Sequence, residues 1–303
     1  MSDFTSNFWE IYISGITLVG IIACLVLLIV TGKMKATTAA DNSTGHVWDG
    51  DLREMNNPLP RWWTYMFVLT IVFSLGYLVL YPGLGSNPGK LGWTSHGQHQ
   101  AEVEKGNAEV APIYARFMAM PPEEVAKDAQ AMAIGERLYG NNCAQCHASD
   151  ARGNKGFPNL TDNDWLYGGT TEKIKETLVG GRMGNMPPMA AAVGSADDVK
   201  NVAHYVLSLS GSPHDATRAA LGQEKFAVCA ACHGADGKGM QAIGSANLTD
   251  NIWLHGYGEK VIVEMVNNGK VNVMPAQAIE NGGKLTDEQI HVLTAYIWGL
   301  SNK

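Results

Sequence analysis

Four of the five cysteines in this 303-residue chain fall into two copies of one short pattern. The pattern reads CAQCH from Cys143 to His147 and CAACH from Cys229 to His233. The two cysteines and the histidine of each copy stand at positions i, i+3 and i+4, which share one face of a helix. Each copy therefore presents two thiols and an imidazole to one common partner.

This pattern is the attachment motif for c-type haem. Two thiols on one helical face can add to the two vinyl groups on one edge of a porphyrin, and the histidine then points at the iron. Tandem zinc sites usually have a shorter gap between their cysteine pairs and need no histidine after the second cysteine. A thioredoxin-like disulfide would require a surrounding βαβ pattern, which is not evident here. We predict two covalently attached haem c groups, bound by Cys143, Cys146 and His147 and by Cys229, Cys232 and His233.

The two haem motifs belong to a longer repeat. The segment NLTDN begins at Asn159 and recurs letter for letter at Asn247. GGRMGNMPP contains Met186, and NGKVNVMPA contains Met274 at the same spacing from NLTDN. Met183 also lies in the first of these stretches, but it has no counterpart in the second. We therefore predict two homologous domains, residues 130–212 and 213–303.

Both copies also share their flanking elements. A helix-like segment with a glycine and, four residues later, an aromatic residue precedes each haem motif. An amphipathic helix with a capping-box signal follows each methionine. The matched residues are Gly135 and Tyr139, Gly222 and Phe226, Ser195 with Asp198, Thr286 with Gln289, and Tyr205 with Tyr296.

Each unit resembles a class I cytochrome c domain on these motifs. The resemblance implies an all-α fold in which the C-terminal helix packs across the N-terminal helix and the haem replaces much of the core. It implies His147 and His233 as proximal iron ligands and Met186 and Met274 as distal ones. Pairing of histidine and methionine within one domain is usual in that family, but the sequence leaves pairing across the two domains open. A His/Met pair fills both axial positions and suits electron transfer rather than substrate binding.

One residue departs from the family pattern. Pro158 precedes NLTDN in the first copy, where the family has a proline whose carbonyl orients the proximal imidazole, and Ala246 stands there in the second. A backbone carbonyl is available in both copies, but the second loop is less rigid. We expect the two haems to differ in reduction potential.

Two uncharged apolar runs precede the haem motifs. They predict transmembrane helices at residues 11–31 and 62–81, because about twenty helical residues span the roughly 30 Å hydrocarbon core of a bilayer. A cleaved signal peptide is the alternative for the first run, with small residues at 36–40 as the cleavage site. However, no Lys or Arg precedes the run, so we interpret it as a retained span. Cys24, within this run, is expected to be a small hydrophobe buried in the membrane.

The basic residues around these runs predict their orientation. The connecting residues 32–61 hold Lys33, Lys35, Arg53 and Arg61, whereas the tail, residues 1–10, has no basic residue. The positive-inside rule places that loop in the cytoplasm and both termini outside. The linker 82–129 and both haem domains are then periplasmic, on a multi-pass protein of a bacterial inner membrane. The formal net charge of −7 disfavours nucleic acid as a partner.

The cytoplasmic loop narrows the resemblance further. Its simplest interpretation is a polar turn in which Pro58 and Pro60 stop any helix and Trp62 and Trp63 anchor the membrane interface. However, GHVWDG followed by NNPLPRWW, ahead of a membrane helix and two haem motifs, resembles the dihaem cytochrome c subunit of cbb-type haem–copper oxidases. Many members of that family have a single membrane helix, so the two predicted here are a variant. We expect NNPLPRWW to be a docking and orientation element.

The resemblance implies a non-catalytic electron-transfer subunit. It would accept electrons from a soluble or membrane cytochrome c and pass them to the monohaem and catalytic haem–copper subunits of a proton-translocating cytochrome c oxidase, which reduces oxygen to water. Its other partner would be membrane lipid. A free-standing membrane-anchored dihaem cytochrome serving other reductases remains an alternative. A dihaem peroxidase is a weaker one, because a peroxidase needs a displaceable iron ligand and both copies here offer Met-Pro.

Overall fold

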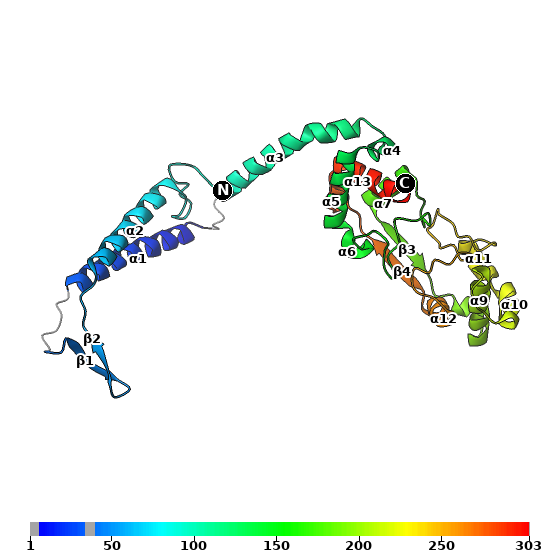
Figure 1. Cartoon of the computed structure of the whole chain (residues 1–303), viewed down its shortest axis with the longest axis horizontal. Coiled ribbons are helices and arrows are strands. Elements are labelled where there is room, and N and C mark those ends of the chain that lie inside the picture. Colours follow the sequence, from blue (N-terminus) through cyan, green and yellow to red (C-terminus); the bar gives the residue numbers. More distant parts are fainter. Residues whose placement is uncertain (1–5, 34–39, 303) are drawn as a thin grey trace. The chain divides into compact units, whose positions relative to one another are not determined.

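The protein was analysed as a computed structural model in which residues 6–33 and 40–302 are described. The chain divides into two units, residues 1–109 and 110–303, coloured blue to green and green to red in Figure 1. The described chain is mostly helical, but the expected all-α class needs a correction. Each unit also contains one two-stranded antiparallel sheet.

The first unit contains two long apolar helices, α1 (Asn7–Lys33) and α2 (Arg61–Leu80). Both are long and apolar enough to cross a membrane, and neither holds a buried residue. Their apolar side chains therefore lack a protein covering in this chain, as expected for helices that face lipid. The helices cover the predicted spans except for Tyr81, which is the C-cap of α2, and α1 extends about a turn beyond the prediction at its N-terminal end.

The segment between these helices contains a β-hairpin that the sequence analysis did not predict. Strands β1 (Ser43–Trp48) and β2 (Leu52–Met55) pair so that Trp48 lies opposite Leu52. The turn has positive φ at Asp49 (50°) and Gly50 (87°), the geometry of a type I′ turn. The Asp-Gly dipeptide is a strong signal for such a hairpin, so the segment is more ordered than a polar turn.

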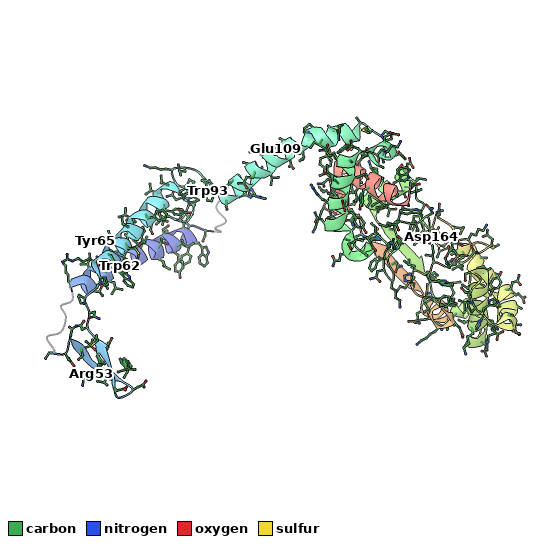
Figure 2. All side chains as sticks on the ribbon, viewed as in Figure 1. Arg53, Trp62, Tyr65, Trp93, Glu109 and Asp164 are labelled. Atoms are coloured by element: carbon green, nitrogen blue, oxygen red, sulfur yellow. The ribbon has the colours of Figure 1, made fainter. Side chains whose placement is uncertain are left out.

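The start of α2 follows from the prolines of NNPLPRWW. Pro60 takes the N-cap position with extended backbone angles, and Arg61 is the first helical residue. Trp62 and Trp63, in the first turn, are largely exposed and have their rings 6.1 Å apart at nearly right angles. Figure 2 labels Trp62 at this end of α2.

Two helices lead to the haem motifs. Helix α3 (Ser95–Met118) spans the boundary between the two units, and the short α4 (Pro122–Val125) begins at a proline with Pro121 as its N-cap. The next helix, α5 (Ala129–Asn142), is capped by Asp128, whose carboxylate accepts backbone hydrogen bonds of 2.8 and 3.0 Å.

Three buried apolar clusters lie in the described part of unit 2; the two larger ones define two modules, and the third packs α3, α4 and α5 against the C-terminal helix. The first module consists of α5, α6 (Ala144–His147), α7 (Thr171–Gly180) and the C-terminal helix α13 (Asp287–Ser301), with the 3₁₀ turn Ile279–Asn281 (η1) before α13. The second module consists of α8 (Ala190–Val193), α9 (Ala196–Leu209), α10 (Ala216–Lys225), α11 (Ala227–His233) and α12 (Glu259–Asn268).

The modules do not coincide with the sequence repeats, because the C-terminal helices are exchanged. The family pattern places each such helix across the N-terminal helix of its own repeat. Here α13, from the second repeat, packs on α5 of the first, and α9, from the first repeat, packs on α10 of the second. The short connection between α9 and α10, residues 210–215, holds these two helices together as a hairpin.

Glycines allow both helix crossings. A Cβ atom on Gly135 of α5 would lie 2.5 Å from Cβ of Tyr296 of α13. A Cβ atom on Gly222 of α10 would overlap the backbone oxygen of Asn201 in α9. The predicted capping boxes at Ser195 and Thr286 are both formed, so the two exchanged helices begin at the expected residues.

The chain passes between the modules through two paired strands. β3 (Arg182–Met186) and β4 (Lys270–Met274) run antiparallel, with Arg182 opposite Met274 and Met186 opposite Lys270. Figure 1 shows this ribbon between the helices of unit 2. Gly181 precedes β3 with a φ of 69°, and Gly269 precedes β4 with the same φ. Each glycine lies against the last residue of the opposite strand.

Candidate haem-binding site

The first C-x-x-C-H motif forms a single helical turn. The backbone N–H groups of Cys146 and His147 donate to the carbonyl of Cys143 at 3.1 and 3.0 Å. Cys143 and His147 are each 7% exposed, whereas Cys146 is exposed. Burial raises the pKa of the Cys143 thiol to about 11, so it is protonated at neutral pH. A buried, protonated thiol suits an apolar thioether link better than a thiolate–metal bond.

The second motif lies at the end of α11. Cys229 is half-buried, where Cys143 is buried, and Cys232 is exposed like Cys146. Burial also raises the pKa of the Cys229 thiol above its ordinary value. The two motifs therefore present the same chemistry in the two modules.

Each motif histidine is held by a carbonyl. Nδ1 of His147 lies 2.9 Å from the carbonyl oxygen of Pro158, and Nδ1 of His233 lies 2.9 Å from that of Ala246. A carbonyl can only accept, so Nδ1 carries the proton and Nε2 keeps its lone pair for a metal. The carbonyl contacts expected at these two positions are confirmed, and replacing proline by alanine does not lengthen the second.

Both motifs line one continuous cavity of about 460 Å³. Its wall includes both motif histidines, Cys143, Cys229, Cys232, Met186 and Met274. Most other wall residues are apolar and come from both cores, among them Leu160, Ile174, Leu178, Val202, Val206 and Ile262. The apolar walls and the two sets of Cys, His and Met groups match the chemistry that two haem c groups need.

The two repeated methionines are exchanged between the modules in the same way as the C-terminal helices. Met274 packs against the first core together with Cys143 and Leu178, and Met186 packs against the second core together with Cys229. The structure therefore brings Met274 into the module of His147 and Met186 into the module of His233. Met189 also reaches the cavity beside the second core, whereas Met183 is 72% exposed.

Two polar residues of the cavity wall were missed by the sequence analysis. Among the described residues, the buried side-chain atoms without a hydrogen-bond partner are Oη of Tyr167 and Nη2 of Arg182. Cζ of Arg182 lies 4.8 Å from the centre of the Tyr167 ring. The repeat held a signal for the arginine, because the matching position is also basic, Lys270. Unsatisfied donors in an apolar cavity fit a group that carries an acceptor, as a haem carries its carboxylates.

Family models match three stretches of the chain. Residues 40–88 match the N-terminal domain of cytochrome oxidase-cbb3, FixP. Residues 129–206 match the cytochrome c oxidase, cbb3-type, subunit III family, and residues 219–301 match the cytochrome c family. The first match contains the β-hairpin and NNPLPRWW, and the other two contain the haem motifs.

Several curated proteins are similar over most of their length. The Cbb3-type cytochrome c oxidase subunit CcoP of Rubrivivax gelatinosus is 66% identical over 301 residues, which are 99% of this chain and 97% of the relative. The subunit FixP of Azorhizobium caulinodans is 41% identical, over 84% of this chain and 92% of the relative. FixP of Bradyrhizobium diazoefficiens is 40% identical, over 87% and 96%.

Near full-length similarity and the two cytochrome c domains imply covalently bound haem c, with two domains for two haems. The chain belongs to the CcoP/FixP family of cbb3-type cytochrome c oxidase subunits, and its role is electron transfer.

Proposed function

We propose that this chain is the dihaem subunit of a cbb3-type oxidase and relays electrons from a cytochrome c donor to the monohaem and catalytic subunits. The observation that carries the proposal is the single cavity lined by both C-x-x-C-H motifs. Because both motifs line the same cavity, the two haems that they would hold share one apolar environment. Each haem iron, when bound, supplies a one-electron couple, and the chain holds the two couples within reach of each other.

The proposed axial pairs are His147 with Met274 and His233 with Met186. The support is packing, since each methionine lies against the core that contains the other repeat's histidine motif. The Nδ1 contacts to Pro158 and Ala246 fix both imidazole planes. With both axial positions filled, neither iron has a free position for peroxide or oxygen, which disfavours the peroxidase alternative.

The proposed location is a bacterial inner membrane, with the haem modules and both termini in the periplasm. Helices α1 and α2 would be the two spans, and the hairpin with NNPLPRWW would be cytoplasmic. Four basic residues flank the spans on the hairpin side, which supports this orientation. Electrons would then enter and leave on the periplasmic side.

We assign docking against the catalytic subunit to the hairpin and the adjoining NNPLPRWW. Val47, Trp48 and Leu52 are each more than half exposed although they are apolar. An exposed apolar hairpin next to a membrane helix suits contact with another membrane subunit better than contact with water.

The function is tested by purification from the native membrane with a C-terminal tag and a mild detergent. We expect two covalent haems per chain, co-purification of haem–copper and monohaem subunits, and oxygen uptake with reduced cytochrome c. Recovery of the chain with both haems but no oxidase subunits would support the free-standing cytochrome instead. Peroxide-dependent turnover by the chain alone would support the peroxidase.

The pairing of methionine and iron is tested separately. We expect Met274→Leu to remove the methionine-to-iron charge-transfer absorption of one haem, and Met186→Leu that of the other. In a variant that lacks Cys229 and Cys232, and so carries only the first haem, Met274→Leu should abolish this absorption and Met186→Leu should leave it intact. The reverse result would establish pairing within each repeat.

A further inference from the structure

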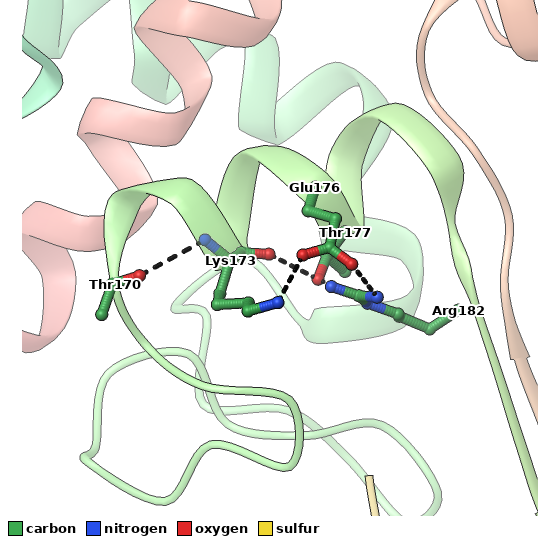
Figure 3. Close-up of polar contacts among 5 residues, drawn as sticks. All are labelled: Thr170, Lys173, Glu176, Thr177 and Arg182. Carbon is green, nitrogen blue, oxygen red and sulfur yellow. Dashed lines mark hydrogen bonds and ion pairs between the residues drawn. The ribbon is translucent and has the colours of Figure 1, made fainter. Parts of the chain in front are cut away.

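The guanidinium of Arg182 is fixed on one side and unsatisfied on the other. Nη1 donates to Oε1 of Glu176 at 2.7 Å, and Nε donates to Oγ1 of Thr177 at 3.0 Å. Lys173 adds an ion pair of 2.7 Å to the same glutamate (Figure 3). These cations, Arg182 first, lower the pKa of Glu176 to about 2, so the carboxylate stays charged and holds the arginine. Nη2 remains buried, without a partner, at the cavity wall.

Tyr167 provides a second unsatisfied donor at the same place. Its ring lies under the guanidinium, and its hydroxyl is buried without a partner. The ring also occupies the space where a side chain at Gly244 would lie. The phenol is therefore held in place next to the arginine, with both orphan donors on the wall of one cavity.

In the described part of the chain, neither Nη2 of Arg182 nor the Tyr167 hydroxyl has an acceptor. Leaving a buried donor unsatisfied costs stability, and the cost is larger for a charged group. Glu176 is already bonded, and Asp164 lines the cavity without a hydrogen bond to either donor in the structure. A guanidinium N–H and a phenol O–H side by side suit a carboxylate, which can accept from both.

We propose, on the basis of the function proposed above, that Arg182 and Tyr167 bind a propionate carboxylate of the haem attached to Cys143 and Cys146. Arg182 lies in the first module, because it bonds to α7 and stands opposite Met274. The same strand ends in Met186, which reaches the second module. Strand β3 thus provides the carboxylate-binding cation for one haem and the methionine for the other.

The matching positions in the second module do not form the same site. Lys270 replaces Arg182 and is exposed, and His255 replaces Tyr167. Nε2 of His255 lies 2.9 Å from the side-chain nitrogen of Asn272, so this ring already has a partner. Among the described residues, only the first haem would therefore have a partly buried, fixed cation next to its carboxylate. The positive charge stabilises the reduced form of this haem relative to the oxidised form. It therefore raises the reduction potential of this haem.

The test is a redox titration of the full chain in its complex, in which the two one-electron components of this chain are identified as those that Met274→Leu and Met186→Leu move. We expect Arg182→Gln to lower the midpoint of one component by about a tenfold change in its reduction equilibrium, which is about 59 mV for a one-electron couple. Arg182→Lys should shift that component less, and Tyr167→Phe should shift it in the same direction. Arg137→Gln, at an exposed cation of α5, is the matched control and should shift neither component.

The component is assigned with the methionine variants. Arg182→Gln should move the component that Met274→Leu moves and leave the one that Met186→Leu moves. A shift in neither component, an equal shift in both, or a shift in the Met186 component would overturn the proposal. Added acetate should not change the wild-type midpoints, and a change would show that a free carboxylate occupies the site instead.

Failure of the proposed function can be distinguished from failure of this inference. Loss of covalent haem or of the oxidase subunits in the wild-type preparation would contradict the function. Unchanged haem content and subunit composition, with unshifted potentials in Arg182→Gln, would contradict only the carboxylate site.

Discussion

Gly135 of the first repeat and Tyr296 of the second are in direct contact where α5 crosses α13. The ring of Tyr296 also lies against Tyr139, with 5.7 Å between the ring centres. In the second module, the equivalent pair is Phe226 and Tyr205, 5.2 Å apart. The same crossing is thus made twice, each time between helices of different repeats.

This contact predicts that Gly135→Ala destabilises the first module. The new methyl group would overlap Tyr296 and force the helices apart, at a cost of about 1–3 kcal/mol, typical of overpacking. Gly140→Ala is the matched control, because Gly140 lies in the same helix with open space around it. That change should stabilise the helix by about 0.5–1 kcal/mol. Denaturant unfolding followed by haem absorbance measures both, and equal effects would contradict the crossing.

The hydroxyl of Tyr139 donates to the carbonyl of Ala148 at 2.8 Å, just after the first haem motif. Ala148 has a φ of 64°, so the bond holds the chain in a strained turn. We expect Tyr139→Phe to cost about 1–2 kcal/mol of unfolding free energy. The haem of this module should then dissociate from its methionine at lower denaturant concentration than in the wild type.

The same tyrosine predicts an alkaline pH dependence. Burial raises its pKa above the ordinary value of about 10, so the folded chain holds the proton more tightly than the unfolded chain. Its contribution to stability is complete below pH 10 and is lost as the pH rises through the folded-state value. The stability difference between wild type and Tyr139→Phe should therefore shrink above pH 10. A constant difference from pH 8 to pH 11 would contradict this.

Removing the charge of Asp164, which is labelled in Figure 2, should increase the stability of the chain, whereas Tyr139→Phe should decrease it. Burial, then the charges of Asp250 and Asp162, raise its pKa above the ordinary value. Its ionised form therefore costs stability, a cost that is absent below about pH 4 and grows as the pH rises through the folded-state value. Asp164→Asn should stabilise the chain at pH 7 and not at pH 3. Glu280→Gln, at an exposed site, should do neither.

If the hairpin docks against the catalytic subunit, changes in it should weaken assembly of the complex without affecting haem attachment. Gly50 has a φ of 87°, and a side chain there would cost about 1–2 kcal/mol. Gly50→Ala, and separately the combined replacement of Pro58, Pro60 and Arg61, should reduce co-purification of the catalytic subunit while both haems stay attached. Gly106→Ala, in α3 with open space around it, should change neither. Intact assembly in both variants would contradict the docking role, and the segment would then be only a connecting turn.

Much of the site could be predicted because its chemistry depends on local spacing. The haem motifs and the repeated methionines were visible in the sequence, and the two carbonyls beside the histidines and the capping boxes lie where it placed them. The axial roles of the methionines stay a prediction. The hairpin was missed although its Asp-Gly turn is a known signal.

The helix exchange could not be predicted from the repeat alone. Helices α9 and α13 have the same capping pattern and the same tyrosine, Tyr205 and Tyr296, so either could pack on either haem helix. The deciding feature is the six-residue connection between α9 and α10. It is so short that α9 and α10 pack on each other, and α9 does not return to α5. The donors of Arg182 and Tyr167 were missed because only packing leaves them without partners.

The exchange of helices also determines the order in which the two modules can be completed during synthesis. When the first haem motif leaves the ribosome, α13 and Met274, which complete its module, have not yet been made. The second motif finds α9 and Met186 already synthesised. The first module can therefore close only after the second repeat has been synthesised.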